Sequence, residues 1–346
     1  MACKVPSVPV PVLFGPTASG KTGVLFRLFG PGGLCPLKAE IVSADSMQVY
    51  RGMDIGTAKP SASEMARLPH HLIDIRDPGE QFNAGDFVRL ALEAIADIAD
   101  RGAVPVVSGG TGFYLKNLVL GLPEAPPCDA AIRDALKLEL RKKGAAALMG
   151  ELARFDPVSA ERIHLNDEYR LLRALEVLRL SGRPLSSFDV STRPVSASAG
   201  ASAGASANAD AGNRFRFAVF GLFRPKEELY GRIDERCADM FSRGLPDEVR
   251  RLHESGYTPR DPGLRAIGYR EFFTEDEPNG DGTPASYRLS TDLAGVRELV
   301  ARNSRRYAKR QITFFASLPG ARRITAAGDD DETARLLWRE LEGVLL

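Results

Sequence analysis

The sequence predicts an α/β fold, a parallel sheet with flanking helices that is interrupted by an all-helical insertion domain. Three observations predict it. Apolar runs alternate with amphipathic stretches up to Leu120, as they do in a parallel sheet covered by helices. A glycine-rich loop joins the first apolar run to the first helical stretch. From Asp129 to Leu180 the pattern is helical, without a convincing strand.

The elements of the sheet and its covering helices follow from hydrophobic periodicity. The expected strands are 8–14, 40–44, 70–75, 104–107 and 214–222. The expected helices are 23–28, 87–99, 113–120, 227–243 and 296–315. In the helix at 87–99 we expect Leu90, Ala94 and Ile98 to form the buried stripe. The glycine-rich stretches 49–60 and 275–285 are expected to be loops.

Changes in composition divide the chain into four parts. Residues 1–122 are expected to form the first part of the α/β core, and a proline-rich linker then opens a helical insertion domain at 123–195. The Ala/Ser/Gly tract at 196–212 lacks the apolar mass to offset chain entropy, so we expect a disordered linker. Residues 213–346 should return the chain to the core and add C-terminal helices.

Charge and cysteine content narrow the classes of protein. The formal net charge of the 346 residues is only +1, so any nucleic-acid partner must be held by local basic clusters. The four cysteines have no C-x-x-C spacing, which disfavours a zinc site or disulfide framework and is typical of a reducing cytoplasm. There is no signal-peptide pattern, and no apolar run approaches the roughly 20 residues of a membrane helix. We therefore expect a cytoplasmic protein without a membrane partner.

The loop between the first strand and helix matches the phosphate-binding pattern G-x-x-x-x-G-K-[ST]. In such loops backbone N–H groups and a helix N-terminus surround phosphate oxygens, so the sheet should be P-loop NTPase-like. Lys21 would neutralise the terminal phosphate, and Thr22 would help to hold Mg²⁺. The expected phosphate- or diphosphate-binding residues are Gly15, Pro16, Thr17, Ala18, Ser19, Gly20, Lys21 and Thr22.

Two further polar segments follow predicted strands, where α/β sheets place their ligands. The first runs from Asp45 to Gln48 and the second is Gly109-Gly110-Thr111. Asp45 is interpreted either as a strand-end turn or helix cap, or as a carboxylate that accepts a proton or holds a metal. The two glycines allow either a turn or a close approach of backbone to ligand, beside which Thr111 could donate to a phosphate oxygen.

Basic residues gather in three places: around Arg170 and Arg173, in the segment 265–270, and along the helix at 302–310. A charged helix face is often simply solvated. Three basic clusters in an otherwise neutral chain nevertheless favour a nucleic-acid groove, in which Tyr169, Tyr269 and Tyr307 are available for stacking.

An ordinary motor ATPase is disfavoured because the best central strand, 104–107, runs into Ser108-Gly109-Gly110 and not into an aspartate for Mg²⁺. The four histidines lack ligand spacing and are expected to be structural. Two other functions remain open, a P-loop small-molecule kinase that uses ATP and a nucleotide-gated RNA-binding protein without catalytic activity. The kinase alternative leaves the basic helix unexplained.

Four segments together resemble the bacterial tRNA dimethylallyltransferases, also called tRNA isopentenyltransferases. They are GPTASGKT at 15–22, DSMQVYRGMDIGTAKP at 45–60, GGTGFY at 109–114 and KRQ at 309–311. The resemblance spans nearly the whole chain, although Ala316 stands where the family often has an arginine. It implies transfer of a dimethylallyl group from dimethylallyl diphosphate to N6 of the adenine on the 3′ side of the tRNA anticodon, with Mg²⁺ as cofactor.

The resemblance also implies roles for individual residues. Asp45 would take the proton from adenine N6, Thr111 and Arg236 would act at the breaking bond, and Lys21 would stabilise the diphosphate. The helical insertion would grip the anticodon stem-loop of a tRNA, and we expect the protein to be a monomer. The tRNA contacts that the resemblance implies are Asp45, Ser46, Met47, Gln48, Arg133, Tyr169, Arg170, Arg173, Arg265, Gly268, Tyr269, Arg270, Lys309, Arg310 and Gln311.

Overall fold

The computed structural model describes residues 7–122, 125–188, 214–276, 286–318, 320–326 and 330–346. The chain divides into two compact units. The first consists of Met1–Val119 together with Pro194–Leu346, and the second is Leu120–Arg193. The predicted disordered tract at 196–212 lies outside the described residues.

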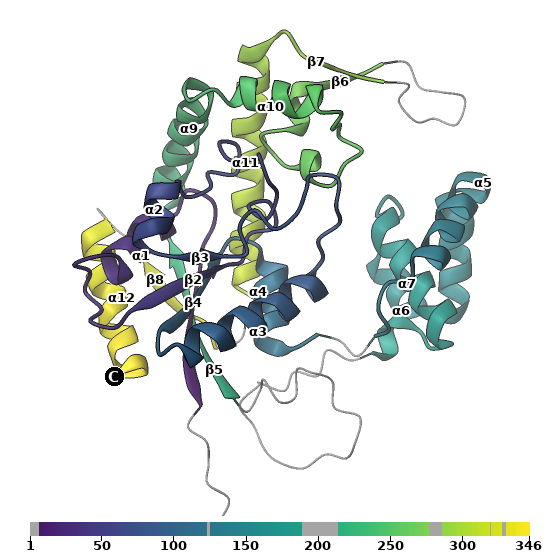
Figure 1. Ribbon diagram of the computed structural model, residues 1–346. Coiled ribbons are helices and arrows are strands. Elements are labelled where there is room, and N and C mark those ends of the chain that lie inside the picture. Colours follow the sequence, from purple (N-terminus) through teal and green to yellow (C-terminus); the bar gives the residue numbers. More distant parts are fainter. Residues whose placement is uncertain (1–6, 123–124, 189–213, 277–285, 319, 327–329) are drawn as a thin grey trace, which may run out of the picture. The chain divides into compact units, whose positions relative to one another are not determined.

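A parallel sheet forms the centre of the first unit, as the sequence predicts (Figure 1). The order of its six strands is β3-β2-β4-β1-β5-β8, and every neighbouring pair is parallel. Strand β1 lies between β4 and β5 and is fully buried from Val10 to Phe14. The strands are β1 Val8–Phe14, β2 Ala39–Ser43, β3 His70–His71, β4 Val104–Gly109, β5 Phe215–Phe223 and β8 Arg322–Thr325.

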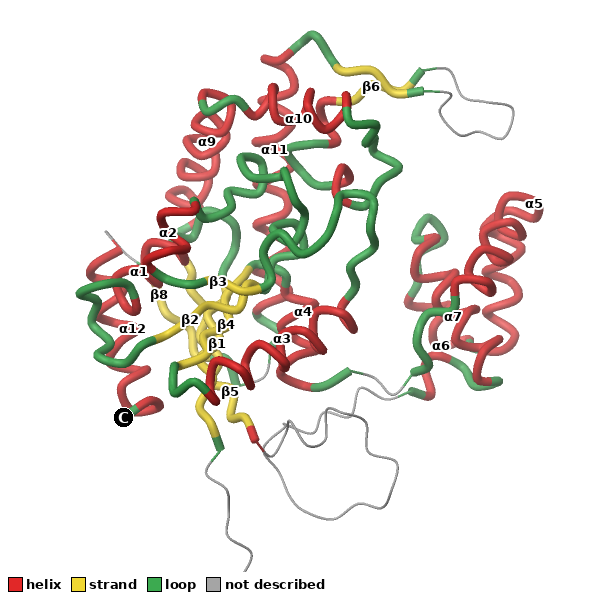
Figure 2. Tube along the Cα trace, viewed as in Figure 1, coloured by secondary structure: helices red, strands yellow, loops and turns green. Residues whose placement is uncertain are grey.

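Helices cover both faces of this sheet (Figures 1 and 2). On one face α1 (Lys21–Phe29) packs against α12 (Asp330–Leu345), and the two share a core with Leu13, Phe220 and Leu222. On the other face lie α3 (Ala84–Asp100) and α4 (Gly112–Leu120). The sequence did not predict β8 or α12, which add an edge strand and a helix to the C-terminal end of the chain.

A second core in the first unit joins segments that are far apart in the sequence. It is built from α9, α10 and α11, from the loop around Val49 and Met53, and from the segment around Tyr269 and Phe272. Of these, α10 was not predicted, nor were α2 and the hairpin β6–β7. The remaining elements of the unit are α2 Ala62–Arg67, α9 Lys226–Ser242, α10 Leu245–Glu254, η2 Gly263–Arg265, η3 Arg270–Phe272, β6 Phe273–Glu275, β7 Tyr287–Leu289 and α11 Leu293–Phe315.

The second unit is helical in its described residues and has its own core. Asp129, Asp156 and Asp167 each accept a backbone N–H at a helix N-terminus, so each start is capped. Gly182 ends the last long helix in the left-handed conformation. The buried leucines of this core include Leu171 and Leu175. The helices are α5 Ala130–Phe155, α6 Pro157–Arg162, α7 Glu168–Ser181 and η1 Leu185–Ser187.

Three local predictions were wrong. The strand expected at 70–75 stops at His71, because Leu72 and Asp74 adopt positive φ angles of 62° and 56° that break the ladder. In α3 the buried residues are Phe87, Val88, Ala91, Ile95 and Ile98, so of the expected stripe only Ile98 is buried. Glu275, expected in a loop, ends strand β6, and residues 277–285 lie outside the described part of the chain.

The separate core of the second unit leads to a prediction. Leu175→Ala should lower the stability of the helical unit by about 2–5 kcal/mol, because it leaves a cavity among fully buried leucines. Leu138→Ala, at a side chain 54% exposed on α5, is the matched control and should change stability by less than about 0.5 kcal/mol. Hydrogen exchange resolved by segment measures both. Loss of protection in β1 and β4 equal to that in α5 and α7 would contradict separate cores.

Candidate active site

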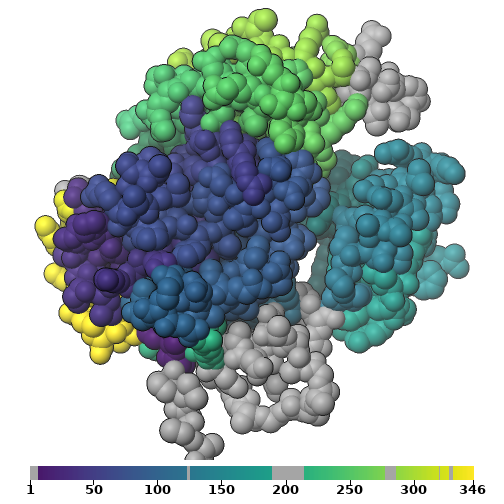
Figure 3. All heavy atoms as spheres, viewed as in Figure 1, coloured from purple at the N-terminus to yellow at the C-terminus, as the bar shows by residue number. Residues whose placement is uncertain are grey.

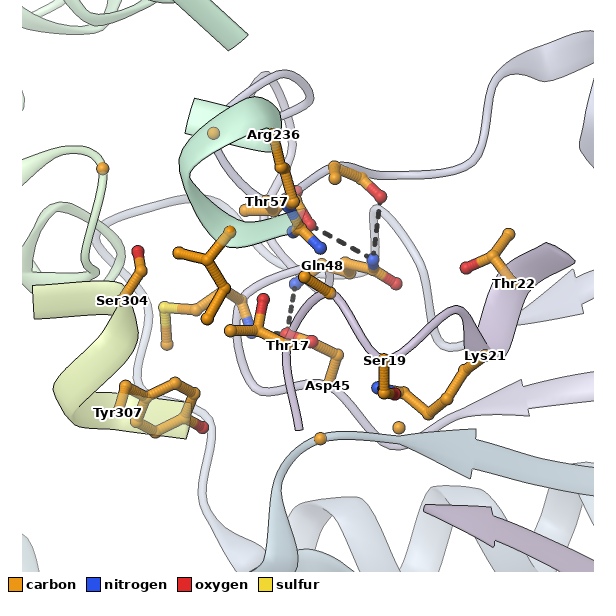
Figure 4. A pocket seen from close by; sticks show the side chains of 18 of the residues that line it. Thr17, Ser19, Lys21, Thr22, Asp45, Gln48, Thr57, Arg236, Ser304 and Tyr307 are labelled. Carbon is orange, nitrogen blue, oxygen red and sulfur yellow. Dashed lines mark hydrogen bonds between the residues drawn. The ribbon is translucent and has the colours of Figure 1, made fainter. Parts of the chain in front are cut away.

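The carboxyl ends of β1, β2 and β4 open onto one cavity of about 820 Å³ (Figure 4). Because these strands are parallel neighbours, the three polar segments that follow them meet at one edge of the sheet. Residues Thr17 to Thr22, Asp45 to Gln48 and Ser108 to Gly110 all line this cavity. The volume is within the range of small-molecule sites.

The phosphate loop lies between β1 and α1, as the sequence predicts. Gly20 has a φ of 92° and precedes the first residue of α1, Lys21. The Lys21 ammonium donates to the carbonyl oxygens of Gly15 at 2.8 Å and Pro16 at 3.0 Å. Gly15 and Pro16 therefore contribute carbonyls behind the loop, whereas the residues from Thr17 onward form the wall of the cavity.

Three side chains from the second half of the chain hold this loop. The Arg224 Nε donates to the Ser19 carbonyl at 2.9 Å, and the Arg232 Nε donates to the Ala18 carbonyl at 3.0 Å. The Gln311 Oε1 accepts the Thr17 N–H at 2.9 Å, while its Nε2 donates to the Gly110 carbonyl at 2.7 Å. Gln311 thus joins the phosphate loop to the turn after β4.

The start of α12 touches the same loop. Asp330 accepts from Arg224 at 3.2 Å, and its carboxylate lies against Gly20 and Gly23. A Cβ added to Gly23 would stand 2.0 Å from Asp330 Oδ2, and one added to Gly20 would stand 2.9 Å from Asp330 Oδ1. A side chain at either position would collide with the Asp330 carboxylate. Glycine at both positions therefore lets the start of α12 pack against the phosphate loop.

Asp45 forms the predicted strand-end turn and also lines the cavity, while its role as a proton acceptor or metal ligand stays a prediction. Its Oδ1 accepts the Met47 N–H at 2.8 Å, which makes it a strand-end turn. Its side chain also lines the cavity, where Figure 4 shows it among Thr17, Lys21 and Gln48. Thr111 Oγ1 accepts the Ser46 N–H at 3.0 Å and so holds this turn, and the predicted contact between Thr111 and a diphosphate stays a prediction.

The electrostatics of the cavity favour an anion. Desolvation by burial and the nearby Arg236 guanidinium lower the pKa of Lys21 to about 7, which Asp45 partly opposes. Burial also lowers the pKa of Arg236, whose guanidinium has no hydrogen-bond or ion-pair partner within the described part of the chain. Asp45 is the carboxylate whose charge acts on both of these buried cations, and a bound polyanion would add further negative charge beside them.

The predicted RNA contacts of the first unit divide into exposed and buried groups. Arg270, Lys309 and Arg310 are exposed, and Ser46, Met47, Gln48 and Gly268 line the cavity. Arg265 is also exposed and donates to the carbonyls of Pro259 and Arg260. Tyr269 and Gln311 need correction as surface contacts. Tyr269 is fully buried with its hydroxyl on Glu248, and Gln311 is buried with both ends of its amide bonded inside the protein.

In the second unit, the predicted RNA contacts surround a buried carboxylate. Glu176 is fully buried and accepts from Arg133 at 3.0 Å and Arg173 at 3.1 Å. The Arg133 guanidinium also lies 4.6 Å from the ring centre of Tyr169, which is 66% exposed. Arg170 is exposed and pairs with Asp167. Tyr169 and Arg170 are thus at the surface, whereas Arg173 is committed to Glu176 and the Pro126 carbonyl.

Comparison with known proteins identifies the family. The family described as IPP transferase matches residues 48–318. The tRNA dimethylallyltransferase of Geobacter sulfurreducens is 40% identical over 329 residues, which cover 95% of each chain. The chain belongs to the tRNA dimethylallyltransferase family. The same-named protein of Acidovorax ebreus is 42% identical over 333 residues, again with 95% of each chain covered.

Solved structures agree with this membership in the family. A tRNA isopentenylpyrophosphate transferase from Bacillus halodurans is 33% identical, with a TM-score of 0.62 over 97% of this chain and 96% of the other. A eukaryotic dimethylallyltransferase, described in crystallographic snapshots as acting on tRNA, has a TM-score of 0.75 over 97% of this chain and 78% of the other, and at 24% identity it supports the fold alone.

Sequence reasoning missed several residues that shape this family site. Arg224 follows β5, and its position at a strand end beside β1 was the available signal. Asp330 had no such signal, because neither β8 nor α12 was predicted. Glu248 accepts the N–H of the cavity-lining Gly56, and it lies in α10, which was also not predicted.

The described residues contain no cluster of three or more His, Cys, Asp or Glu side chains that could hold a metal ion. Thr22, the residue predicted to help hold Mg²⁺, lines the cavity, and its role toward the ion stays a prediction. In the same part of the chain, no helix is both long and apolar enough to cross a membrane.

The pKa of Lys21 predicts proton uptake on anion binding. At about pH 8 Lys21 is mostly neutral, and a bound diphosphate should restore its charge, so binding should take up about one proton more than in Lys21→Arg. At about pH 5.5 the lysine is already charged and the difference should vanish. Calorimetry with inorganic diphosphate in buffers of different ionisation enthalpy measures this. An equal proton uptake by both proteins at both pH values would contradict it.

The contact between α12 and the phosphate loop predicts a compensating pair. Gly23→Ala should cost about 1–3 kcal/mol, because the methyl group would overlap the Asp330 carboxylate. In an Asp330→Ala background the same change should cost almost nothing. Gly231→Ala, on α9 with open space around it, is the control and should not destabilise. Equal costs of Gly23→Ala in both backgrounds, measured by urea unfolding, would show that Asp330 is not the obstacle.

Proposed function

We propose that this protein transfers the dimethylallyl group from dimethylallyl diphosphate to N6 of the adenine on the 3′ side of the tRNA anticodon, and releases diphosphate. The observation that carries the proposal is the shared cavity of Lys21, Asp45 and Arg236, which combines a phosphate loop, a second cation and a carboxylate. The family names of the relatives support the same reaction.

The phosphate-loop end of the cavity suits the leaving group. As the allylic C–O bond breaks, negative charge grows on the diphosphate, and the loop N–H groups with Lys21 and Arg236 are preorganised to stabilise it. The allyl fragment carries positive charge in the transition state. Ile233, Met240 and Val300 line the cavity and offer an apolar surface for its methyl groups.

The acceptor end requires a proton acceptor. The N6 nitrogen forms the new C–N bond with the carbon that diphosphate leaves, and it loses one proton in doing so. The Asp45 carboxylate is the proposed acceptor, because it lines the same cavity as Lys21 and its charge acts on Lys21, Arg236 and Tyr307. Tyr307, whose pKa is raised to about 12 by burial and then by Asp45, stays a neutral phenol there.

An adenine in a stacked anticodon loop cannot enter a cavity of this kind, so we propose that the base leaves the stack to react. Arg302, Arg306, Lys309 and Arg310 on exposed faces of α11 would hold the RNA backbone. We propose that the protein works as a monomer. We expect the reaction in the cytoplasm, where its tRNA substrate is found.

We further propose that Mg²⁺ assists diphosphate binding. Protein-bound Mg²⁺ usually retains several coordinated waters and has few protein ligands. A single hydroxyl, such as that of Thr22, could therefore complete its coordination beside diphosphate oxygens. When bound, the ion would neutralise charge on the leaving group.

The reaction itself is the first test. Protein, Mg²⁺, dimethylallyl diphosphate and unmodified tRNA should yield a nucleoside heavier by one five-carbon unit. Asp45→Asn keeps an oxygen for the Met47 N–H but removes the basic carboxylate, so transfer should fall about 10²- to 10⁴-fold while tRNA affinity is retained. Consumption of ATP with a small acceptor would favour a kinase, and RNA binding without product would favour a non-catalytic protein.

The basic face of α11 gives a second test. Arg306→Ala should weaken tRNA binding and reduce the slope of log affinity against log salt by roughly 0.7–0.9, because one phosphate contact is lost. Arg335→Ala, an exposed arginine on α12, is the matched control and should leave the slope unchanged. Filter binding at several salt concentrations measures both, and equal slopes for Arg306→Ala and the unaltered protein would exclude a backbone contact.

A further inference from the structure

One wall of the cavity is a loop without regular structure. Gly56, Thr57 and Ala58 line the cavity from one segment, and Ala266, Ile267 and Gly268 line it from another. Figure 3 shows the blue atoms of the first segment's region directly against the green atoms of α9 to α11. A wall made of loops needs fixed anchors, because an irregular backbone does not satisfy its own N–H groups.

The anchor is Glu248 on α10, a side chain only 2% exposed. Its Oε2 accepts the N–H groups of Asp54 at 2.9 Å and Ile55 at 2.8 Å. Its Oε1 accepts the Gly56 N–H at 3.1 Å and the Tyr269 hydroxyl at 2.7 Å. Four uncharged donors therefore surround a single buried carboxylate, and they come from both cavity-lining segments.

Side-chain packing also holds the two wall segments together, at the contact between Gly56 and Tyr269. A Cβ added to Gly56 would stand 2.5 Å from Cε2 of the Tyr269 ring, so the loop backbone lies directly on that fully buried ring. Glu248 and Tyr269 are not themselves among the residues that line the cavity. Their contacts act on the backbone of the wall from behind.

Hydrogen bonds continue from this junction to the turn of Asp45. The Gln48 Nε2 donates to the carbonyls of Thr57 at 3.4 Å and Ala58 at 3.3 Å. The Gln48 N–H in turn lies 3.4 Å from Asp45 Oδ1. The phosphate loop is held by other side chains, Arg224, Arg232 and Gln311, and none of these is bonded to Glu248.

We propose that Glu248, with Tyr269, is a positioning residue for the acceptor half of the cavity. It fixes the 54–58 wall, and through Gln48 the turn of Asp45, where the base of the RNA must be received, without acting on the diphosphate half. This assignment rests on the proposed transfer to tRNA.

The test is Glu248→Gln in the full chain. The glutamine amide would turn an N–H donor toward backbone N–H groups, so the amides of 54–56 should exchange with solvent at least tenfold faster. With dimethylallyl diphosphate and tRNA, kcat should fall at least tenfold, while the dissociation constant for inorganic diphosphate should stay within twofold. Glu254→Gln, an exposed residue at the end of the same helix, is the control and should change none of these.

A second variant protects the test against loss of folding. Tyr269→Phe keeps the ring on Gly56 and removes only one donor, so kcat should fall at least threefold with diphosphate affinity unchanged. The proposal is overturned if Glu248→Gln alters thermal stability but leaves kcat within twofold, or if both variants weaken diphosphate binding as strongly as transfer. If the unaltered protein makes no prenylated tRNA, the proposed function fails, whereas the exchange rates of 54–56 still report whether Glu248 holds the wall.

Discussion

The site depends on the outward-facing carbonyls of the phosphate loop having partners. A loop that turns its N–H groups toward an anion must turn carbonyl oxygens the other way, and buried carbonyls need donors. Here the donors are Lys21 itself, Arg224 for the Ser19 carbonyl and Arg232 for the Ala18 carbonyl. Ala18 holds a φ of 61°, a conformation that an L-residue keeps only when its surroundings fix it.

The donors to these carbonyls come from both sides of the helical insertion. The phosphate loop, in the part of the core before the insertion, therefore depends on side chains from the part after it. Strand β5 follows the helical unit in the chain and pairs with the whole length of β1. Arg224, the residue after β5, donates a hydrogen bond to the phosphate loop. Helix α11 delivers Gln311 to the loop and to the turn after β4. The helical unit has a distinct set of buried leucines, so its insertion between α4 and β5 does not divide the core of the sheet.

Buried carboxylates organise both units, by different means. Glu176 in the helical unit is matched by two arginines, which commits Arg133 and Arg173 to defined positions. Glu248 is matched by neutral N–H and O–H groups, which defines a backbone wall and not a charge pair. In the cavity, Lys21 and Arg236 are two buried cations whose charges both interact with the carboxylate of Asp45.

The sequence by itself determined the parallel sheet, the phosphate loop and the convergence of residues 17–22, 45–48 and 109–110 on one cavity, because these follow from local periodicity and from the rule for parallel strand ends. It also identified Asp45, Lys21 and Arg236, the last through family resemblance. Only the tertiary structure decided that Tyr269 and Gln311 are internal, that Glu248 receives four donors, and that Asp330 lies on Gly20 and Gly23. Residues 248 and 56, or 330 and 23, are far apart in the chain, and no local pattern records which side chain meets which backbone once the core has packed.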